Sequence, residues 1–198
     1  MSIISKQIWG DKIMLSFEIG ATIFGLLQGI FVLLNKRSNW IFYIAQIICL
    51  LSFSYLNKLY GDVLSNSIYF VFGIIGWFLW KNEDVALISV CSGKERLVYS
   101  SIIVLGTIIM FILLSKTQDP LPLIDSFTSV SSFVATYYMV GKKLDTWLIW
   151  FVNDICYVVQ YGLLENQAVY LMSLNIVWTA MAVASFLNWL KIMKGYKK

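Results

Sequence analysis

Seven long apolar runs, separated by short polar segments, dominate the sequence and restrict how the chain can fold. We place these runs at about residues 13–34, 40–56, 61–80, 97–115, 123–140, 147–164 and 168–190. About 20 helical residues span the roughly 30 Å of a bilayer's hydrocarbon core, and each run is close to that length. The chain of 198 residues is 59% hydrophobic and only 13% charged, as is typical of integral membrane proteins. The sequence therefore predicts an all-α integral membrane fold with seven transmembrane helices.

The composition leaves little room for catalysis or metal binding. The chain has no histidine, and its three cysteines, Cys49, Cys91 and Cys156, are not spaced as CxxC. It therefore lacks a histidine base, a histidine metal ligand and the pattern of a zinc site or disulfide framework. The net charge of +4 is spread over the segments between apolar runs, not gathered on one basic surface. We expect no enzyme activity, no metal, no cofactor and no nucleic-acid partner.

Two parts of the sequence match each other at a nearly constant offset. An offset of 107 residues pairs Glu18 with Asp125, Lys36 with Lys143, Trp40 with Trp147, and Gln46 with Asn153. Further along, an offset of 109 pairs Asn66 with Asn175, Gly76 with Ser185, and Trp80 with Trp189. We interpret residues 13–81 and 123–190 as two three-helix repeats and residues 97–115 as a linking helix. This is a 3+1+3 arrangement within a single membrane domain, and the repeats should run parallel because an odd number of spans separates equivalent helices.

Lysine and arginine residues are distributed unevenly between the two sets of loops. The amino terminus and the loops on its side carry 4 of them, whereas the opposite set, which includes the carboxyl terminus, carries 11. Loops rich in these residues remain in the cytoplasm. We therefore expect the amino terminus outside the cell and the carboxyl terminus inside.

The sixth apolar run contains a carboxylate, which is costly to place in hydrocarbon. Asp154 is followed by ten uncharged residues, so it lies well inside the run. Trp147, Trp150 and Asp154 are spaced i, i+3 and i+7 and share one face of a helix. That face suits a planar cation, because indole rings attract cations and a carboxylate neutralises them. In the alternative interpretation, the indoles form an interfacial aromatic belt and Asp154 is a hydrogen-bonded structural residue.

Transporters built from repeats hold their substrate near mid-membrane, between the repeats. The amide side chains inside the apolar runs are therefore candidates for binding it: Gln46, Asn66, Asn153 and Asn175. Aromatic candidates from the first half are Tyr43, Trp77 and Trp80. Serine and threonine are abundant in the fifth run, where they either permit close helix packing or line a polar pathway. Two further acids, Glu18 and Asp125, are expected in the first turn of their helices, where the helix dipole favours them.

Several of these features occur together in a known family. The residues concerned are Glu18, Thr22, Gly25-Leu26-Leu27, Leu59-Tyr60, Gly76-Trp77-Phe78-Leu79-Trp80, Asp125-Ser126, and Trp147-Leu148-Ile149-Trp150 followed by Asp154. In order and spacing they resemble the PnuC-type vitamin transporters, over roughly residues 15–82 and 123–190. The sequence departs from the family's pattern at Ile75, Met181 and Ser185, and these departures bear on the identity of the vitamin more than on the fold.

The resemblance implies a seven-helix core like that of the SWEET sugar carriers and a homotrimer in the lipid of the bacterial cytoplasmic membrane. It also implies facilitated diffusion, with intracellular phosphorylation trapping the vitamin, and substrate contacts by Trp147, Trp150 and the polar positions 153 and 154. Family members carry nicotinamide riboside, thiamine, riboflavin or deoxynucleosides. We expect nicotinamide riboside, a planar cation, and keep the other three as alternatives. An ion-coupled carrier and a non-transporting accessory subunit also remain open.

Overall fold

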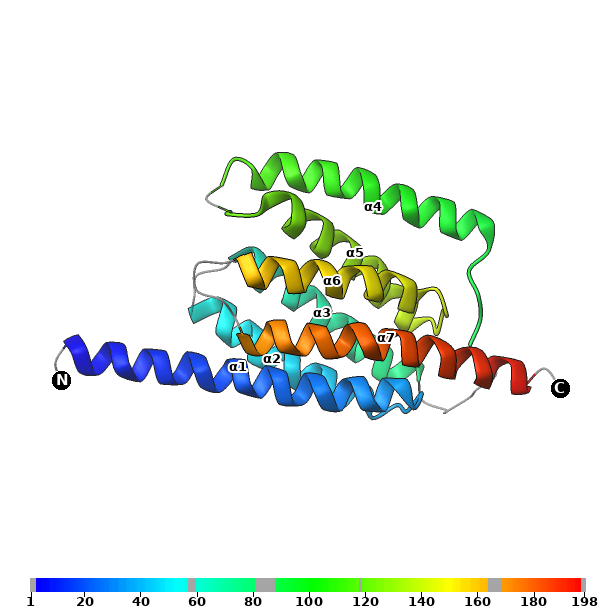
Figure 1. The fold of residues 1–198 in the computed structure, drawn as a ribbon, viewed down its shortest axis with the longest axis horizontal. Helices are drawn as coiled ribbons and strands as arrows, with labels where there is room; N and C mark the ends of the chain where they lie inside the picture. Colours follow the sequence, from blue (N-terminus) through cyan, green and yellow to red (C-terminus); the bar gives the residue numbers. More distant parts are fainter. Residues whose placement is uncertain (1–2, 57–59, 81–87, 118, 164–168, 197–198) are drawn as a thin grey trace.

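The computed structural model describes residues 3–56, 60–80, 88–117, 119–163 and 169–196. Within these ranges the chain forms seven α-helices, as the sequence predicts (Figure 1): α1 (Ile3–Leu33), α2 (Asn39–Leu56), α3 (Tyr60–Leu79), α4 (Gly93–Leu114), α5 (Pro122–Val140), α6 (Thr146–Leu163) and α7 (Val169–Tyr196). Three stretches, Lys12–Leu33, Gly93–Leu114 and Val169–Gly195, are long and apolar enough to cross a membrane, and α2 and α3 contain shorter apolar stretches. Successive helices run in alternating directions.

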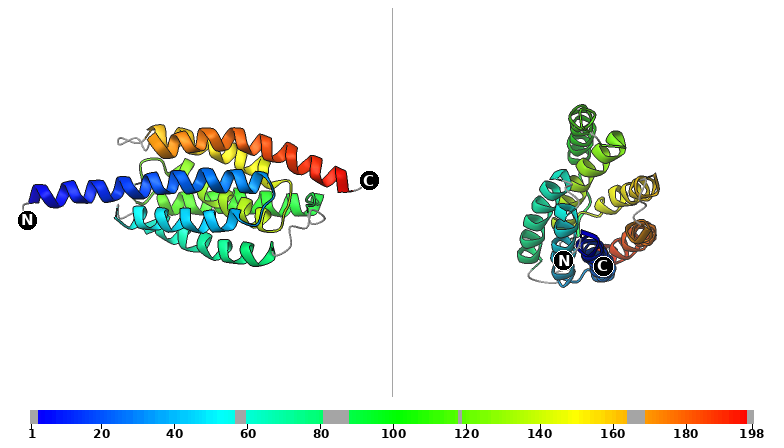
Figure 2. Two further views of the ribbon diagram at one scale, coloured as in Figure 1. Left: turned by 90° about the horizontal axis from the view of Figure 1, so that it is seen from below. Right: turned by 90° about the vertical axis from the view of Figure 1, so that its left-hand side faces the viewer.

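The first helix is longer than predicted, because α1 begins at Ile3 and not near residue 13. Its first turns project beyond the other helices (Figures 1 and 2). Glu18 consequently lies in the middle of α1, so the expectation that it occupies a first turn is wrong. It lies instead beside the backbone N–H groups of Tyr170 and Leu171 in the first turn of α7, where the dipole of that helix favours an acid. Asp125 does lie in the first turn of α5.

The helices pack as two groups of three. α2 packs against α1 and α3, and α6 packs against α5 and α7. Two contacts join the groups, because α1 packs against α7 and α3 packs against α5. Among the described helices α4 packs against α5 alone, and none of its residues is buried. It therefore lies at the edge of the bundle (Figure 1).

The α1–α2 and α5–α6 turns have the same backbone geometry. In the described chain, the non-glycine residues of positive φ are Asn35 at 55°, after α1, and Lys142 at 50°, after α5. The next residue in each turn, Lys36 or Lys143, donates its N–H to the carbonyl oxygen five residues earlier at 2.8 Å. This left-handed closure is a common way to end a helix. The two turns are related by the offset of 107 residues found in the sequence.

Four buried tryptophans, which we call the indole array, meet between the two groups of helices. Trp40 and Trp80 pack edge to face, with ring centroids 5.5 Å apart and planes at 90°. Trp147 and Trp189 pack in the same way, at 5.2 Å and 90°. Trp80 and Trp189 lie 5.8 Å apart and so link the two pairs. Since an aromatic pair contributes about 0.5–1.5 kcal/mol beyond its burial, the contact between Trp80 and Trp189 helps to hold the two groups together.

The segment before α4 is fixed to the α5–α6 turn. Ser89 donates its N–H to the carbonyl of Lys142 at 3.1 Å and accepts a hydrogen bond from the N–H of Leu144 at 2.8 Å. In the same turn, Asp145 forms an ion pair with Arg96 of α4 at 2.7 Å. These contacts attach α4 to the second group of helices at one end.

Gly76 of α3 lies against the indole of Trp40, and a Cβ atom at this position would come within 2.3 Å of the ring. We predict that Gly76→Ala lowers the free energy of unfolding by about 1–3 kcal/mol, because the ring must move to relieve the overlap. The matched control is Gly93→Ala, where a Cβ atom would meet nothing within 4 Å. Thermal unfolding in detergent measures both variants, and equal midpoints would show that the array tolerates the displacement.

Candidate functional site

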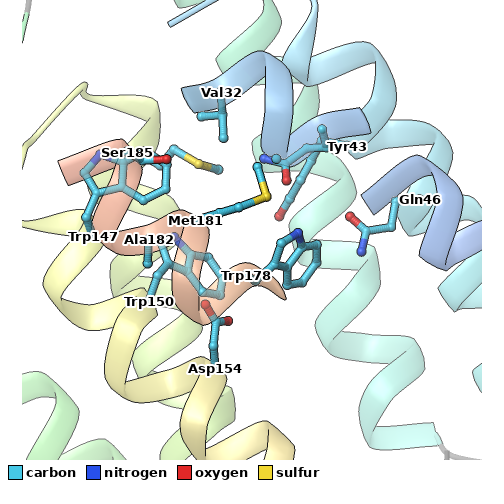
Figure 3. A pocket seen from close by; sticks show the side chains of 13 residues that line it. Val32, Tyr43, Gln46, Trp147, Trp150, Asp154, Trp178, Met181, Ala182 and Ser185 are labelled. Atoms are coloured by element: carbon cyan, nitrogen blue, oxygen red, sulfur yellow. The ribbon is translucent and has the colours of Figure 1, made fainter. Parts of the chain in front are cut away.

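A cavity lies between the two groups of helices (Figure 3). It contains about 480 Å³ that protein atoms do not fill, part of it open to solvent. Helices α1, α2, α5, α6 and α7 contribute to its wall. The lining residues are Gln28, Gly29, Val32, Tyr43, Gln46, Met139, Trp147, Trp150, Asp154, Trp178, Met181, Ala182 and Ser185.

Three tryptophans form much of the wall. Trp147 and Trp150 come from α6, and Trp178 comes from α7 (Figure 3). The Nε1–H of Trp178 donates to the carbonyl oxygen of Gly25 in α1 at 3.2 Å. A Cβ atom on Gly25 would lie 2.9 Å from the Trp178 ring, and one on Gly29 would lie 2.8 Å from the Met181 methyl group. The two glycines thus let α7 approach α1 closely enough to place Trp178 in the wall.

The carboxyl group of Asp154 is the unusual polar feature of this cavity. Asp154 is 2% exposed, and its Oδ1 atom has no hydrogen-bond partner among the described residues. The group points toward the rings of Trp150 and Trp178 (Figure 3). An unpaired acid in such surroundings costs free energy, and a ligand that carries a positive charge would remove that cost.

Half of the predicted site residues line the cavity. They are Tyr43, Gln46, Trp147, Trp150 and Asp154. The three residues from α6 point into one volume, as their spacing predicts (Figure 3). Trp147 is 6% exposed and packs against Trp189, so it is not part of an interfacial aromatic belt.

Asn153, which was predicted to bind the substrate, faces the α5–α6 contact and not the cavity. Its Oδ1 accepts a hydrogen bond from Ser131 at 2.9 Å, and its Nδ2 donates to Ser132. Nearer the start of α5, the Thr128 hydroxyl donates to Gln160 of α6 at 3.3 Å. Of the two roles that the sequence left open for the hydroxyl-rich face of α5, these contacts favour helix packing.

Four other predicted site residues also lie outside the cavity wall. Asn66 and Asn175 are buried, at 8% and 4% exposure, and Asn175 donates to a carbonyl oxygen of its own helix at 2.8 Å. Trp77 lies under the guanidinium of Arg37, which is 3.7 Å from its ring centroid. Trp80 belongs to the indole array. Helical spacing placed these residues inside the bundle but did not show which side of their helix faces the cavity.

The prediction of the site omitted eight residues of the wall: Gln28, Gly29, Val32, Met139, Trp178, Met181, Ala182 and Ser185. Two of them, Met181 and Ser185, were expected near the site but not as binding residues. A signal for Trp178 was present, because Gly25 and Gly29 have the small-xxx-small spacing that brings membrane helices together. The sequence did not show that α7 would be the partner of these glycines.

Comparison with known proteins agrees with this architecture. A family described as nicotinamide mononucleotide transporter matches residues 15–191. Two relatives named nicotinamide riboside transporter PnuC are each 24% identical: one from Neisseria mucosa, over 89% of this chain and 72% of its own, and one from Escherichia coli K12, over 87% and 84%. A solved structure described as the crystal structure of the vitamin B3 transporter PnuC shares the fold, with a TM-score of 0.77 and 21% identity over 98% of this chain and 93% of its own.

Asn153 and Asp154 are neighbours with opposite environments, and their substitutions should have opposite effects on stability. We predict that Asn153→Ala lowers the free energy of unfolding by about 1–3 kcal/mol, because it removes buried hydrogen bonds. Without ligand, Asp154→Asn should raise the free energy of unfolding by about 1–3 kcal/mol, because an amide is less costly to bury than an unpaired carboxylate. Unfolding in detergent measures both. If Asp154→Asn destabilises the protein as much as Asn153→Ala does, the acid has a structural partner.

Proposed function

Because this chain belongs to the nicotinamide mononucleotide transporter family, we propose that it takes up nicotinamide riboside across the bacterial cytoplasmic membrane by facilitated diffusion. Membership makes it a multi-pass membrane transporter and not an enzyme. One observation carries the choice of substrate: the buried, unpaired carboxyl oxygen of Asp154 beside the indole rings of Trp150 and Trp178.

The proposed substrate matches this wall in shape and charge. The nicotinamide ring of the riboside is planar and positively charged, so it can stack on an indole while Asp154 offsets its charge. Its ribose hydroxyls and carboxamide can form hydrogen bonds with Gln28 and Gln46, which also line the cavity. Thiamine is cationic too and shares part of this match, whereas riboflavin and deoxynucleosides are neutral and gain nothing from the acid.

The charge of the wall favours a nucleoside over a nucleotide. No lysine or arginine is among the residues that line the cavity in the described chain. A phosphate group would therefore meet the carboxylate of Asp154 without a cation to pair with, and proteins usually bind phosphate through lysine, arginine or backbone N–H groups. The same property supports the proposed trapping, because a riboside that is phosphorylated inside the cell would no longer fit.

Facilitated diffusion is favoured over ion coupling by the positions of the other membrane acids. Coupling requires an acid that can bind an ion or proton during the transport cycle. Glu18 lies beside the first turn of α7, and Asp125 accepts a hydrogen bond from Gln160 at 3.3 Å. Glu18 Oε1 has no partner in the described chain either, but neither Glu18 nor Asp125 lines the cavity, whereas Asp154 does and its position suits the substrate.

The proposal includes two parallel three-helix repeats, one on each side of the cavity. The matched turns and the matched indole pairs of the two halves support it, as does the position of α4 outside both groups. It also includes a homotrimer, in which the exposed apolar residues of α4, such as Leu97 and Leu105, contact lipid or another protomer. The unequal distribution of lysine and arginine supports an external amino terminus and a cytoplasmic carboxyl terminus.

Purified protein in liposomes tests the function. We predict that radiolabelled nicotinamide riboside equilibrates across the membrane without an ion gradient, and that a sodium or proton gradient imposed with the membrane potential held at zero does not change the final level. Uptake only in the presence of a gradient would reject facilitated diffusion. Flux of thiamine but not of the riboside would show that thiamine is the substrate. If no vitamin or nucleoside crosses the membrane, the protein is better explained as an accessory subunit.

The role of Asp154 can be tested by comparing a charged and an uncharged form of one ligand. We predict that Asp154→Asn weakens binding of nicotinamide riboside by about tenfold, equivalent to about 1.4 kcal/mol, because the ring loses its counter-charge. Binding of the reduced riboside, which has nearly the same shape but no charge on its ring, should change much less. Calorimetric titration of each ligand gives the ratio of its dissociation constants for the variant and the original protein. Equal losses of affinity for the two ligands would show that the acid acts only on the structure.

A further inference from the structure

The indole array contains two hydrogen bonds that cross between the two groups of helices. The Nε1–H of Trp80, in the first group, donates to the carbonyl oxygen of Val140, in the second, at 3.1 Å. The Nε1–H of Trp189, in the second group, donates to the carbonyl oxygen of Val32, in the first, also at 3.1 Å. The two bonds are thus reciprocal. We propose that this pair forms the gate that closes the cavity on the side of the α1–α2 and α5–α6 turns.

The position of the two bonds supports a gate. Val32 and Met139 line the cavity, and the carbonyl groups that accept the bonds belong to Val32 itself and to Val140, the residue after Met139. Trp147 lines the cavity on one side and packs against Trp189 on the other. Of the array, Trp147 lines the cavity, and Trp40, Trp80 and Trp189 lie behind it, next to the two turns. In the proposed gate, a substrate that leaves on this side passes between Trp80 and Trp189, whose rings lie 5.8 Å apart.

The chemistry of the array separates gate residues from packing residues. All four indoles are buried. Of these four, Trp80 and Trp189 have bonded Nε1–H groups, whereas those of Trp40 and Trp147 have no partner among the described residues. Trp40 packs against Trp80, and Trp147 against Trp189, within their own group of helices. In the array, the hydrogen bonds that must break when the groups separate are therefore those of Trp80 and Trp189.

Two neighbouring contacts cross at the same level and add to the closure. The Lys142 ammonium of the second group lies 4.5 Å from the ring centroid of Trp80, a favourable position for a cation over an indole. The side-chain amide of Asn188, also in the second group, donates to the carbonyl oxygen of Leu33 at 2.7 Å. Both contacts join the two groups of helices. Separation of the groups would break them, so they stabilise the closed state.

This inference rests on the proposed carrier function, in which the groups move apart on one side to release the substrate. It goes beyond that function, because it assigns the closed state on that side to two named indole N–H groups. The consequence is that removing either N–H, while keeping an aromatic ring, should shift the population toward the state that is open on the side of the turns.

Cysteine accessibility tests the gate without requiring a substrate. In a background that lacks Cys49, Cys91 and Cys156, Ala182→Cys places one thiol on the cavity wall. A charged, membrane-impermeant thiol reagent is then added to either face of proteoliposomes, and the rate of modification is measured. We expect Trp80→Phe and Trp189→Phe each to raise the rate from the side of the turns by about fivefold, the population change expected for loss of one net hydrogen bond, and to leave the rate from the other side unchanged.

Trp40→Phe is the matched control, since it makes the same substitution in the same array but removes an N–H that has no partner. An equal rise in all three variants would overturn the gate and assign the effect to ring packing. No rise in Trp80→Phe and Trp189→Phe, or a rise from the opposite side, would also overturn it. If either tryptophan variant fails to fold, Asn188→Ala removes a third crossing bond and gives the same readout. A wrong substrate assignment would leave these rates unaffected and would appear only as absent flux of nicotinamide riboside.

Discussion

The structure depends on how four indole rings hold two groups of helices together. Inside a bilayer, lipid tails are as apolar as leucine, so association of helices depends on close packing and on hydrogen bonds between them. The indole array supplies both, through the contact of the Trp80 and Trp189 rings and through the bonds of these two residues to carbonyl groups of the opposite group. Because Trp147 is shared between the array and the cavity wall, the packing in the array also fixes one wall of the cavity.

The neighbouring residues Asn153 and Asp154 show how one helix divides between packing and the cavity wall. Successive residues of a helix point in directions about 100° apart, so Asn153 faces α5 while Asp154 faces the cavity. The amide forms hydrogen bonds to Ser131 and Ser132 and stabilises the fold. The acid leaves its Oδ1 atom without a hydrogen-bond partner among the described residues. A buried polar group that destabilises its own fold is best explained by a ligand that pairs with it.

The sequence was sufficient to predict the helices and part of the site, for identifiable reasons. Long apolar runs define membrane helices whatever their packing. Most ends of the seven helices were therefore predicted to within a few residues. The i, i+3, i+7 spacing of Trp147, Trp150 and Asp154 fixes a common face, and these residues do line one cavity. The start of α1 at Ile3 could not be predicted, because a polar helix that extends beyond the bundle has no apolar run to mark it. Trp178 was missed because its position depends on contact between α1 and α7, which are far apart in the sequence.

Comparison of equivalent positions explains why a site between two similar halves can hold an asymmetric substrate. At the offset of 107 residues, Tyr43 corresponds to Trp150, and both line the cavity, so each half contributes an aromatic ring. One helical turn further on, the halves differ: Ile47 is a buried core residue, whereas its counterpart Asp154 lines the cavity. Shared ancestry of the halves would account for the common shape of the two walls, while this single difference places negative charge on one wall alone. The proposed substrate, a planar cation with a neutral sugar, has the same division between a charged part and an uncharged part, so the proposal implies that it binds in one orientation.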